Sequence, residues 1–305
     1  MTQQTSQHLF CLFLAASILA GCKKPPETAT VPEPAPPEPP SSASPLPSPV
    51  PTANPEPEPS ISNPDIVPDT PGPQPAIVAD ATLSSHLAST AGKPFGQLTE
   101  EELQAFRTLD LQGQEVADLT GLDKLTRLEN ISLGNNQVED ISALSGLEYL
   151  TYLDLSTNHI QSLDGLDGVS NLAYLSIGGN HVVDTSVLAG LEHLEHLAIS
   201  DNPLTDAAPL GKITSLRMLQ ISDTQIRSLA GLESLSGLEE LYLANLPIDD
   251  VTPLHALKNL KRLNLHGTYV SLEKIAALQA AVPGLEIAHD PEPKTEVPPL
   301  TPVIP

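Results

Sequence analysis

Leucine recurs along the middle of the chain at a constant 22-residue step. These leucines occupy one position of a repeating unit, at Leu128, Leu150, Leu172, Leu194, Leu216, Leu238 and Leu260. The other apolar positions keep the same step, and over a whole unit their spacing fits neither the 3.6-residue period of a helix nor the alternation of a strand. Each unit is therefore predicted to be one turn of a coil that combines several backbone conformations, so the chain contains a repeat domain.

The unit also carries a polar signature. In the unit that starts at Leu128, Ile131 and Leu133 are followed by Asn136-Gln137-Val138-Glu139-Asp140-Ile141. This pattern and its length resemble the leucine-rich repeat in its short bacterial form, internalin-like or SDS22-like, over roughly residues 77–290. The resemblance implies an α/β solenoid, a right-handed coil with a parallel β-sheet on the concave face, short 3₁₀ or loop segments on the convex face, and helical N- and C-terminal caps.

Nine pairs of apolar residues mark the predicted strands. They are Leu109/Leu111, Ile131/Leu133, Leu153/Leu155, Leu175/Ile177, Leu197/Ile199, Leu219/Ile221, Leu241/Leu243, Leu263/Leu265 and Leu285/Ile287. Both members of each pair are predicted to face the core, and their neighbours to face outward. The repeat domain then spans residues 106–290, as eight 22-residue repeats and a closing strand.

Helical caps are predicted at both ends of the repeats. In residues 77–105, Thr99 and Glu102 form a capping box, and a short helix is expected over 81–88. Residues 272–281 read as a helix that ends before Pro283-Gly284. Such caps cover the apolar ends that a solenoid would otherwise expose.

Two polar columns are predicted to be structural. A ladder of stacked amides is expected where the chain leaves the strand, at Asn136, Asn158, Asn180 and Asn202. A buried amide offers donors and an acceptor, so it can satisfy backbone groups of the turn. Gln114, Thr224, Leu246 and Thr268 interrupt this ladder toward the ends. Four residues later, Asp or Ser recurs and is expected to cap a short helical turn.

The N-terminal segment has the pattern of an export signal. An apolar run from Leu9 to Ala20 is too short to cross a bilayer. Leu19-Ala20-Gly21-Cys22 resembles a bacterial lipobox, which implies a signal peptide at 1–21 and a lipidated Cys22, although residues 1–8 lack the usual Lys or Arg. We therefore expect a protein held by lipid in the bacterial cell envelope. Lys23 favours the outer membrane, and exposure to the periplasm or to the surface stays open.

Proline-rich segments flank the repeat domain. More than a third of the segment from 23 to 76 is Pro, so residues 22–76 are predicted to form a disordered tether. Residues 291–305 are expected to be a disordered tail of the same kind. Cys11 would leave with the signal peptide, so no thiol would remain for disulfides.

The outward strand positions carry the candidate binding residues. They are Tyr152, Asp154, Tyr174, His196, Met218, Glu240, Tyr242 and Arg262. Three of the five Tyr of the chain lie here, and we expect their side chains to be exposed. Aromatic anchors tend to dominate binding. The resemblance implies that this face binds a protein or peptide, and the alternative is an adhesion or structural protein whose Tyr side chains stack on glycan or peptidoglycan.

Charge and motifs narrow the function further. Residues 77–290 hold 29 Asp and Glu against 11 Lys and Arg, a net charge of −18. Such a surface opposes nucleic acid and favours basic partners or cations, and it also serves solubility. No nucleophile or phosphate-binding motif is found, so we predict neither an enzyme nor a cofactor. The domain is expected to be monomeric.

Two pairs of stacked side chains are of the types that bind metal ions. His159 and His181 lie one repeat apart, as do Asp201 and Asp223. Neither pair has an evident third or fourth ligand in its column, so Zn²⁺ or Ca²⁺ binding is not predicted.

Overall fold

The computed structural model describes residues 78, 80–94, 96–292, 294 and 297. The chain divides into the units Met1–Asp65 and Ile66–Pro305, and every described residue belongs to the second. The predicted signal peptide, Cys22 and the tether therefore lie outside the described residues. Among those that are described, no helix has the length and apolar character needed to cross a bilayer.

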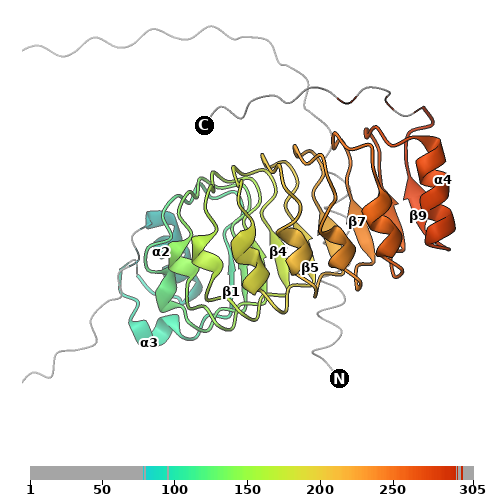
Figure 1. The fold of residues 1–305 in the computed structure, drawn as a ribbon. Coiled ribbons are helices and arrows are strands. Elements are labelled where there is room, and N and C mark those ends of the chain that lie inside the picture. The colour runs from blue at the N-terminus through green and yellow to red at the C-terminus, as the bar shows by residue number, and fades with distance from the viewer. Residues whose placement is uncertain (1–77, 79, 95, 293, 295–296, 298–305) are drawn as a thin grey trace, which may run out of the picture. The chain divides into compact units, whose positions relative to one another are not determined.

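The described residues form one parallel sheet of nine three-residue strands that follow each other in chain order. The strands are β1 Thr108–Asp110, β2 Asn130–Ser132, β3 Tyr152–Asp154, β4 Tyr174–Ser176, β5 His196–Ala198, β6 Met218–Gln220, β7 Glu240–Tyr242, β8 Arg262–Asn264 and β9 Glu286–Ala288. Figure 1 shows them side by side along the domain. The predicted α/β solenoid with one strand per repeat is confirmed.

The register of the sheet follows from the 22-residue step. Leu153 of β3 pairs with Ile131 of β2 and with Leu175 of β4, and the pairs on either side keep the same offset. In each strand from β1 to β8 the central residue is buried and its two neighbours face outward. The next apolar residue, such as Leu155, is buried as well, because side chains two residues apart on an extended chain point to the same side.

The core is aliphatic and continuous. All seven leucines of the 22-residue column, from Leu128 to Leu260, are at most 3% exposed. A fully buried Leu side chain contributes roughly 1.5–3 kcal/mol relative to an exposed one. Since each repeat covers the apolar face of the next, the stability of the coil rests on contacts between neighbours.

Short 3₁₀ helices connect the strands on the opposite side of the coil (Figure 1). In the described part they are η1 Leu122–Lys124, η2 Ser142–Leu144, η3 Asp164–Leu166, η4 Ser186–Gly190, η5 Leu210–Lys212, η6 Leu232–Ser234 and η7 Thr252–Ala256. The backbones of neighbouring turns approach each other most closely at two glycines. A Cβ at Gly165 would overlap the carbonyl oxygen of Ile141, and one at Gly211 would overlap that of Gly231.

Helices close both ends of the coil, as predicted. Helix α2 (Ala81–Thr90) starts from Asp80, and α3 (Glu100–Leu103) starts from the Thr99 capping box, in which the side chains of Thr99 and Glu102 bond each other's backbone N–H. At the other end, α4 (Leu272–Ala281) is capped by Ser271 and precedes β9. Each helix contributes buried apolar side chains to the core, such as Leu87 in α2, Leu103 in α3 and Leu278 in α4.

The amide column links each repeat to the one before it. Asn180 is 4% exposed, and its Nδ2 donates to the carbonyls of Leu155 and Ile177, both at 3.0 Å. Its Oδ1 accepts from the N–H of Ile160, also at 3.0 Å. Equivalent bonds are made by Asn136, Asn158 and Asn202. Where Thr224 takes the position, its hydroxyl donates within its own turn, to the Ile221 carbonyl at 3.0 Å.

A second column, just before the amides, adopts the left-handed backbone conformation. It consists of Gly113, Asn135, Thr157, Gly179, Asp201, Asp223, Asn245 and Gly267, with φ between 54° and 72°. Gly, Asn and Asp tolerate this region, whereas a β-branched residue such as Thr157 is strained there. Sequence reasoning missed this column, although the recurrence of Gly, Asn and Asp at the 22-residue step was its signal.

Candidate binding surface

The outward side chains of strands β1 to β8 form one continuous surface, which we call the sheet face. One column runs Thr108, Asn130, Tyr152, Tyr174, His196, Met218, Glu240 and Arg262, and the other runs Asp110, Ser132, Asp154, Ser176, Ala198, Gln220, Tyr242 and Asn264. All eight candidate residues named from the sequence lie on this face. The structure gathers them into two groups with Met218 between.

An aromatic cluster occupies β3 to β5. The rings of Tyr152 and Tyr174 are stacked, with centroids 4.6 Å apart and planes at 11°. The His196 ring lies 6.2 Å from Tyr174 and is tilted by 30°. These three residues are direct neighbours in the register, so the stack follows from the 22-residue step.

The expectation that the tyrosines would be exposed is wrong. Tyr152, Tyr174 and Tyr242 face outward but are half-buried, since neighbouring side chains on the sheet cover part of each ring. Burial raises the pKa of Tyr174 to about 12, and the Asp154 carboxylate adds to this effect. Burial also raises the pKa of Tyr152, and the nearby Tyr174, Asp154 and Asp110 raise it further. Both phenols are therefore neutral donors at physiological pH.

Two carboxylates stand beside the aromatic cluster. Asp154 Oδ1 accepts the N–H of Ser156 at 2.9 Å, and Asp110 Oδ1 accepts that of Gln112 at 3.3 Å. The second oxygen of Asp154 lies beside Gly134, where a Cβ would sit 3.2 Å from it. None of the ion pairs within the described residues involves either carboxylate. This part of the sheet face therefore carries uncompensated negative charge.

The other group of candidate residues is internally neutralised. Glu240 forms an ion pair with Arg262 from the next strand and accepts a hydrogen bond from the Tyr242 hydroxyl at 2.7 Å. Burial raises the pKa of Tyr242, and its bond to Glu240 raises it further. Beside this network, Glu239 pairs with Arg217 and Lys261. The two ends of the sheet face thus differ in charge although their backbone geometry is the same.

The stacked His and Asp pairs belong to the turns. The rings of His159 and His181 lie 6.1 Å apart and tilted by 47°. Asp201 and Asp223 belong to the left-handed column, and Asp223 accepts a hydrogen bond from Asn245 at 2.8 Å. Within the part of the chain that the structure describes, no group of three or more His, Cys, Asp or Glu side chains is arranged to hold a metal ion.

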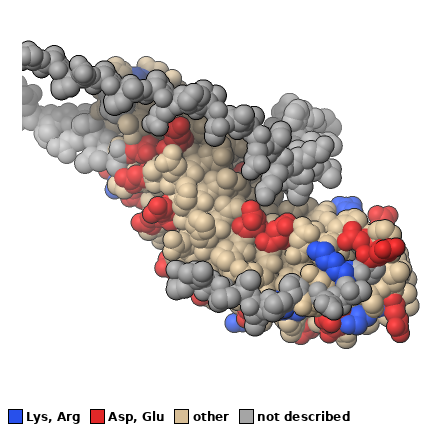
Figure 2. All heavy atoms as spheres, turned by 90° about the horizontal axis from the view of Figure 1, so that it is seen from above, with Lys and Arg blue, Asp and Glu red and all other residues tan. Residues whose placement is uncertain are grey.

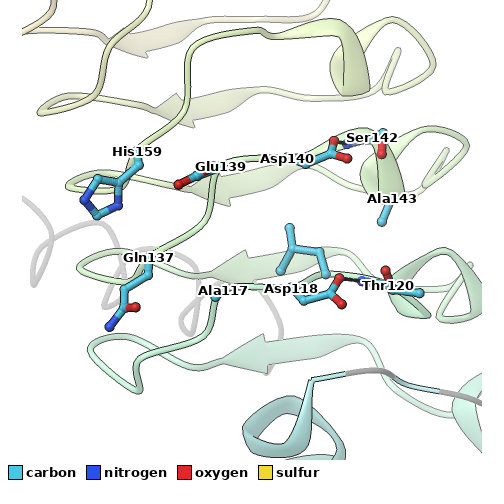
Figure 3. Close-up of a pocket in the computed structure, with 10 residues that line it drawn as sticks. Ala117, Asp118, Thr120, Gln137, Glu139, Asp140, Ser142, Ala143 and His159 are labelled. Atoms are coloured by element: carbon cyan, nitrogen blue, oxygen red, sulfur yellow. Dashed lines mark hydrogen bonds between the residues drawn. The ribbon is translucent and has the colours of Figure 1, made fainter.

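A shallow hollow of about 480 Å³ lies away from the sheet face, between the turns of the first repeats (Figure 3). Asp118 and Asp140 line it from neighbouring repeats, together with Glu139 and His159. Both Asp side chains accept backbone N–H groups two residues ahead, at 2.8 Å, as expected for turn caps. Hydrogen bonds from Thr120 lower the pKa of Asp118. Asp118 and Asp140 therefore serve to cap their turns.

Comparison with known proteins agrees with this architecture. A family model described as leucine-rich repeats in two copies matches residues 107–146, 126–168 and 214–254. An internalin (inlF) from Listeria monocytogenes is similar in structure, with 29% identity and a TM-score of 0.66 over 71% of this chain and 66% of that one. Internalin C2 (inlC2) from the same organism has 30% identity and a TM-score of 0.53, over 63% of this chain and 97% of that one. A search of curated proteins gives no match.

The chain belongs to the leucine-rich repeat family. It is similar to bacterial internalins, and it spans just under two thirds of the length of the first of them. No enzyme family is indicated by these matches, and they support a scaffold for protein interaction.

Proposed function

We propose that this protein is a non-catalytic scaffold, anchored by lipid in the bacterial cell envelope, that binds a protein partner through its sheet face, the concave side of the solenoid. The observation that carries the proposal is the stacked pair Tyr152 and Tyr174 on that face. Half-buried aromatic rings present apolar area that is already ordered, so binding costs little additional entropy. Hydrogen bonds between neighbouring repeats support the sheet beneath them.

The envelope location rests on the sequence around Cys22. A diacyl or triacyl anchor would hold the chain durably, because each buried methylene contributes about 0.8 kcal/mol. The Pro-rich segment from 23 to 76 would extend up to about 170 Å in polyproline II conformation, which would hold the repeat domain well away from the lipid. Metabolic labelling with a radioactive fatty acid tests this, with C22S as the variant that should lose both label and membrane fraction.

The binding proposal is tested by capture from an envelope extract. The full-length chain should retain a partner that the double variant Y152A/Y174A loses. The matched control is Y149A, whose ring is 55% exposed and lies off the strands, and which should retain the partner. Circular dichroism establishes that all variants are folded. If both variants lose the partner, or if neither does, binding through the sheet face is refuted. If the chain captures no protein but is retained on purified cell wall, glycan binding is supported instead.

A further inference from the structure

Positive charge is absent from a long central part of the repeat domain. The segment from 128 to 211 contains no Lys or Arg but 12 Asp and Glu. This segment forms strands β2 to β5 and their connections. On the side of the domain in Figure 2, most of the visible Lys and Arg lie toward the end that carries α4. Four successive repeats therefore present only acidic and neutral side chains.

On the sheet face, this segment coincides with the aromatic cluster. Asp154 lies two residues after Tyr152 on the same side of β3 and is in register with Ser132 and Ser176. These neighbours are small, so they leave the carboxylate accessible beside the two phenol rings. Asp110 extends the acidic column by two strands, with Ser132 between them.

At the other end of the sheet face, a carboxylate is neutralised by an ion pair. Glu240 is paired by Arg262 from the adjacent strand. Asp154 has the corresponding position open, because the register places Ser132 and Ser176 where a basic residue would have to stand. No Lys or Arg of the neighbouring strands is in register with Asp154, so a cation that pairs with it would come from a partner.

We infer that the partner presents a cationic segment, a stretch bearing Arg or Lys, to the surface formed by Asp110, Asp154, Tyr152 and Tyr174. The inference rests on the proposed function and names the chemistry of its partner. The aliphatic stem of an Arg or Lys packs against aromatic rings while its charged head reaches a carboxylate. Complementary charge of this kind fixes the register of a complex and speeds the encounter.

Two other occupants are disfavoured by the same charge argument. The chain's own segment from 23 to 76 carries seven Asp and Glu against two Lys. A second copy of the repeat domain would bring a net charge of −18 to an already acidic face. Like charges brought together oppose association, so neither is expected to cover the aromatic cluster.

The test uses the full-length chain in detergent and two labelled peptides as probes, one with five Arg separated by Gly and Ser and one with Glu in place of Arg. Fluorescence anisotropy should show binding of the Arg peptide only, weakened by added salt. The variant D110N/D154N keeps the oxygen that accepts the backbone N–H of Gln112 and Ser156. It should bind roughly 2- to 30-fold more weakly, as expected for the loss of two ion pairs.

The matched control is E148Q/E192Q, which removes two exposed charges away from the strands. It should change the affinity by less than about twofold. Equal weakening by both double variants would mean a general field effect and would overturn the inference, as would failure of the Arg peptide to bind. A partner captured by the chain and lost in Y152A/Y174A, but retained by D110N/D154N, would leave the proposed function standing and refute its cationic chemistry. Binding of the Arg peptide that D110N/D154N weakens, without any partner captured from the extract, would support the cationic chemistry and refute the proposed function.

Discussion

Replacing Asn180 by Ala should strongly destabilise the domain. The change removes three hydrogen bonds of 3.0 Å, two donated by Nδ2 and one accepted by Oδ1, and a longer one of 3.4 Å from Nδ2 to the Gly178 carbonyl. A buried hydrogen bond contributes roughly 1 kcal/mol net, and a buried donor left without a partner costs about 1–3 kcal/mol. The N–H of Ile160 would be such a donor, since Asn180 is 4% exposed and shields it from water. We expect the free energy of unfolding to fall by about 3–5 kcal/mol.

Urea unfolding followed by far-ultraviolet circular dichroism measures this loss, because the chain contains no Trp for fluorescence. The matched control is N171A, which removes an exposed amide with a single bond to the Glu148 carbonyl at 2.7 Å. It should cost less than about 1 kcal/mol, as typical surface substitutions do. In a coil whose repeats contact only their neighbours, the weakened junction at Asn180 should also broaden the transition. A midpoint for N180A that matches that of N171A would refute the reasoning.

Three further predictions concern other parts of the domain. G165A should lower the free energy of unfolding by about 1–3 kcal/mol, because its methyl group would overlap a backbone oxygen, whereas G190A, with open space around it, should not; thermal unfolding compares the two. T157N should raise the free energy of unfolding by about 1 kcal/mol by relieving a strained φ of 54°, and an unchanged melting temperature would contradict this. The pKa of Tyr174 is about 12 when folded against 10 when unfolded, so its stabilising contribution should be complete below pH 10 and lost between pH 10 and 12. A titration followed by phenolate absorbance, compared with that of Y174F, should show one tyrosine ionising near pH 12. No difference from Y174F near pH 12 would contradict the prediction.

The strands and caps could be predicted because their signals are periodic or local. The 22-residue step sets the register of every strand pair up to β8, and Thr99 with Glu102 specifies the start of α3 without help from the rest of the fold. The capping role of Asp118 follows equally from its place in the unit.

The remaining features depend on contacts between side chains of different repeats. The burial of Tyr152 arises from a ring one repeat away, and an exposure estimate for a single strand does not include that contact. The network of Glu240, Tyr242 and Arg262 depends on side-chain rotamers that no spacing specifies. The lack of Lys and Arg from 128 to 211 is visible in the sequence, but its effect on the sheet face follows only once β2 to β5 are known to be neighbours in one sheet.

Because the register is constant, the length of the sheet can change by whole repeats. Because the junctions from β1 to β8 use the same offset, a duplicated unit inserted between two of them would form two new junctions of the type already present. Each added copy would lengthen the sheet by about 4.8 Å and leave both end helices in contact with the repeats they now cover. The number of repeats therefore sets the length of the binding surface. Duplication or loss of a repeat can fit that surface to a longer or shorter partner while the core packing stays the same.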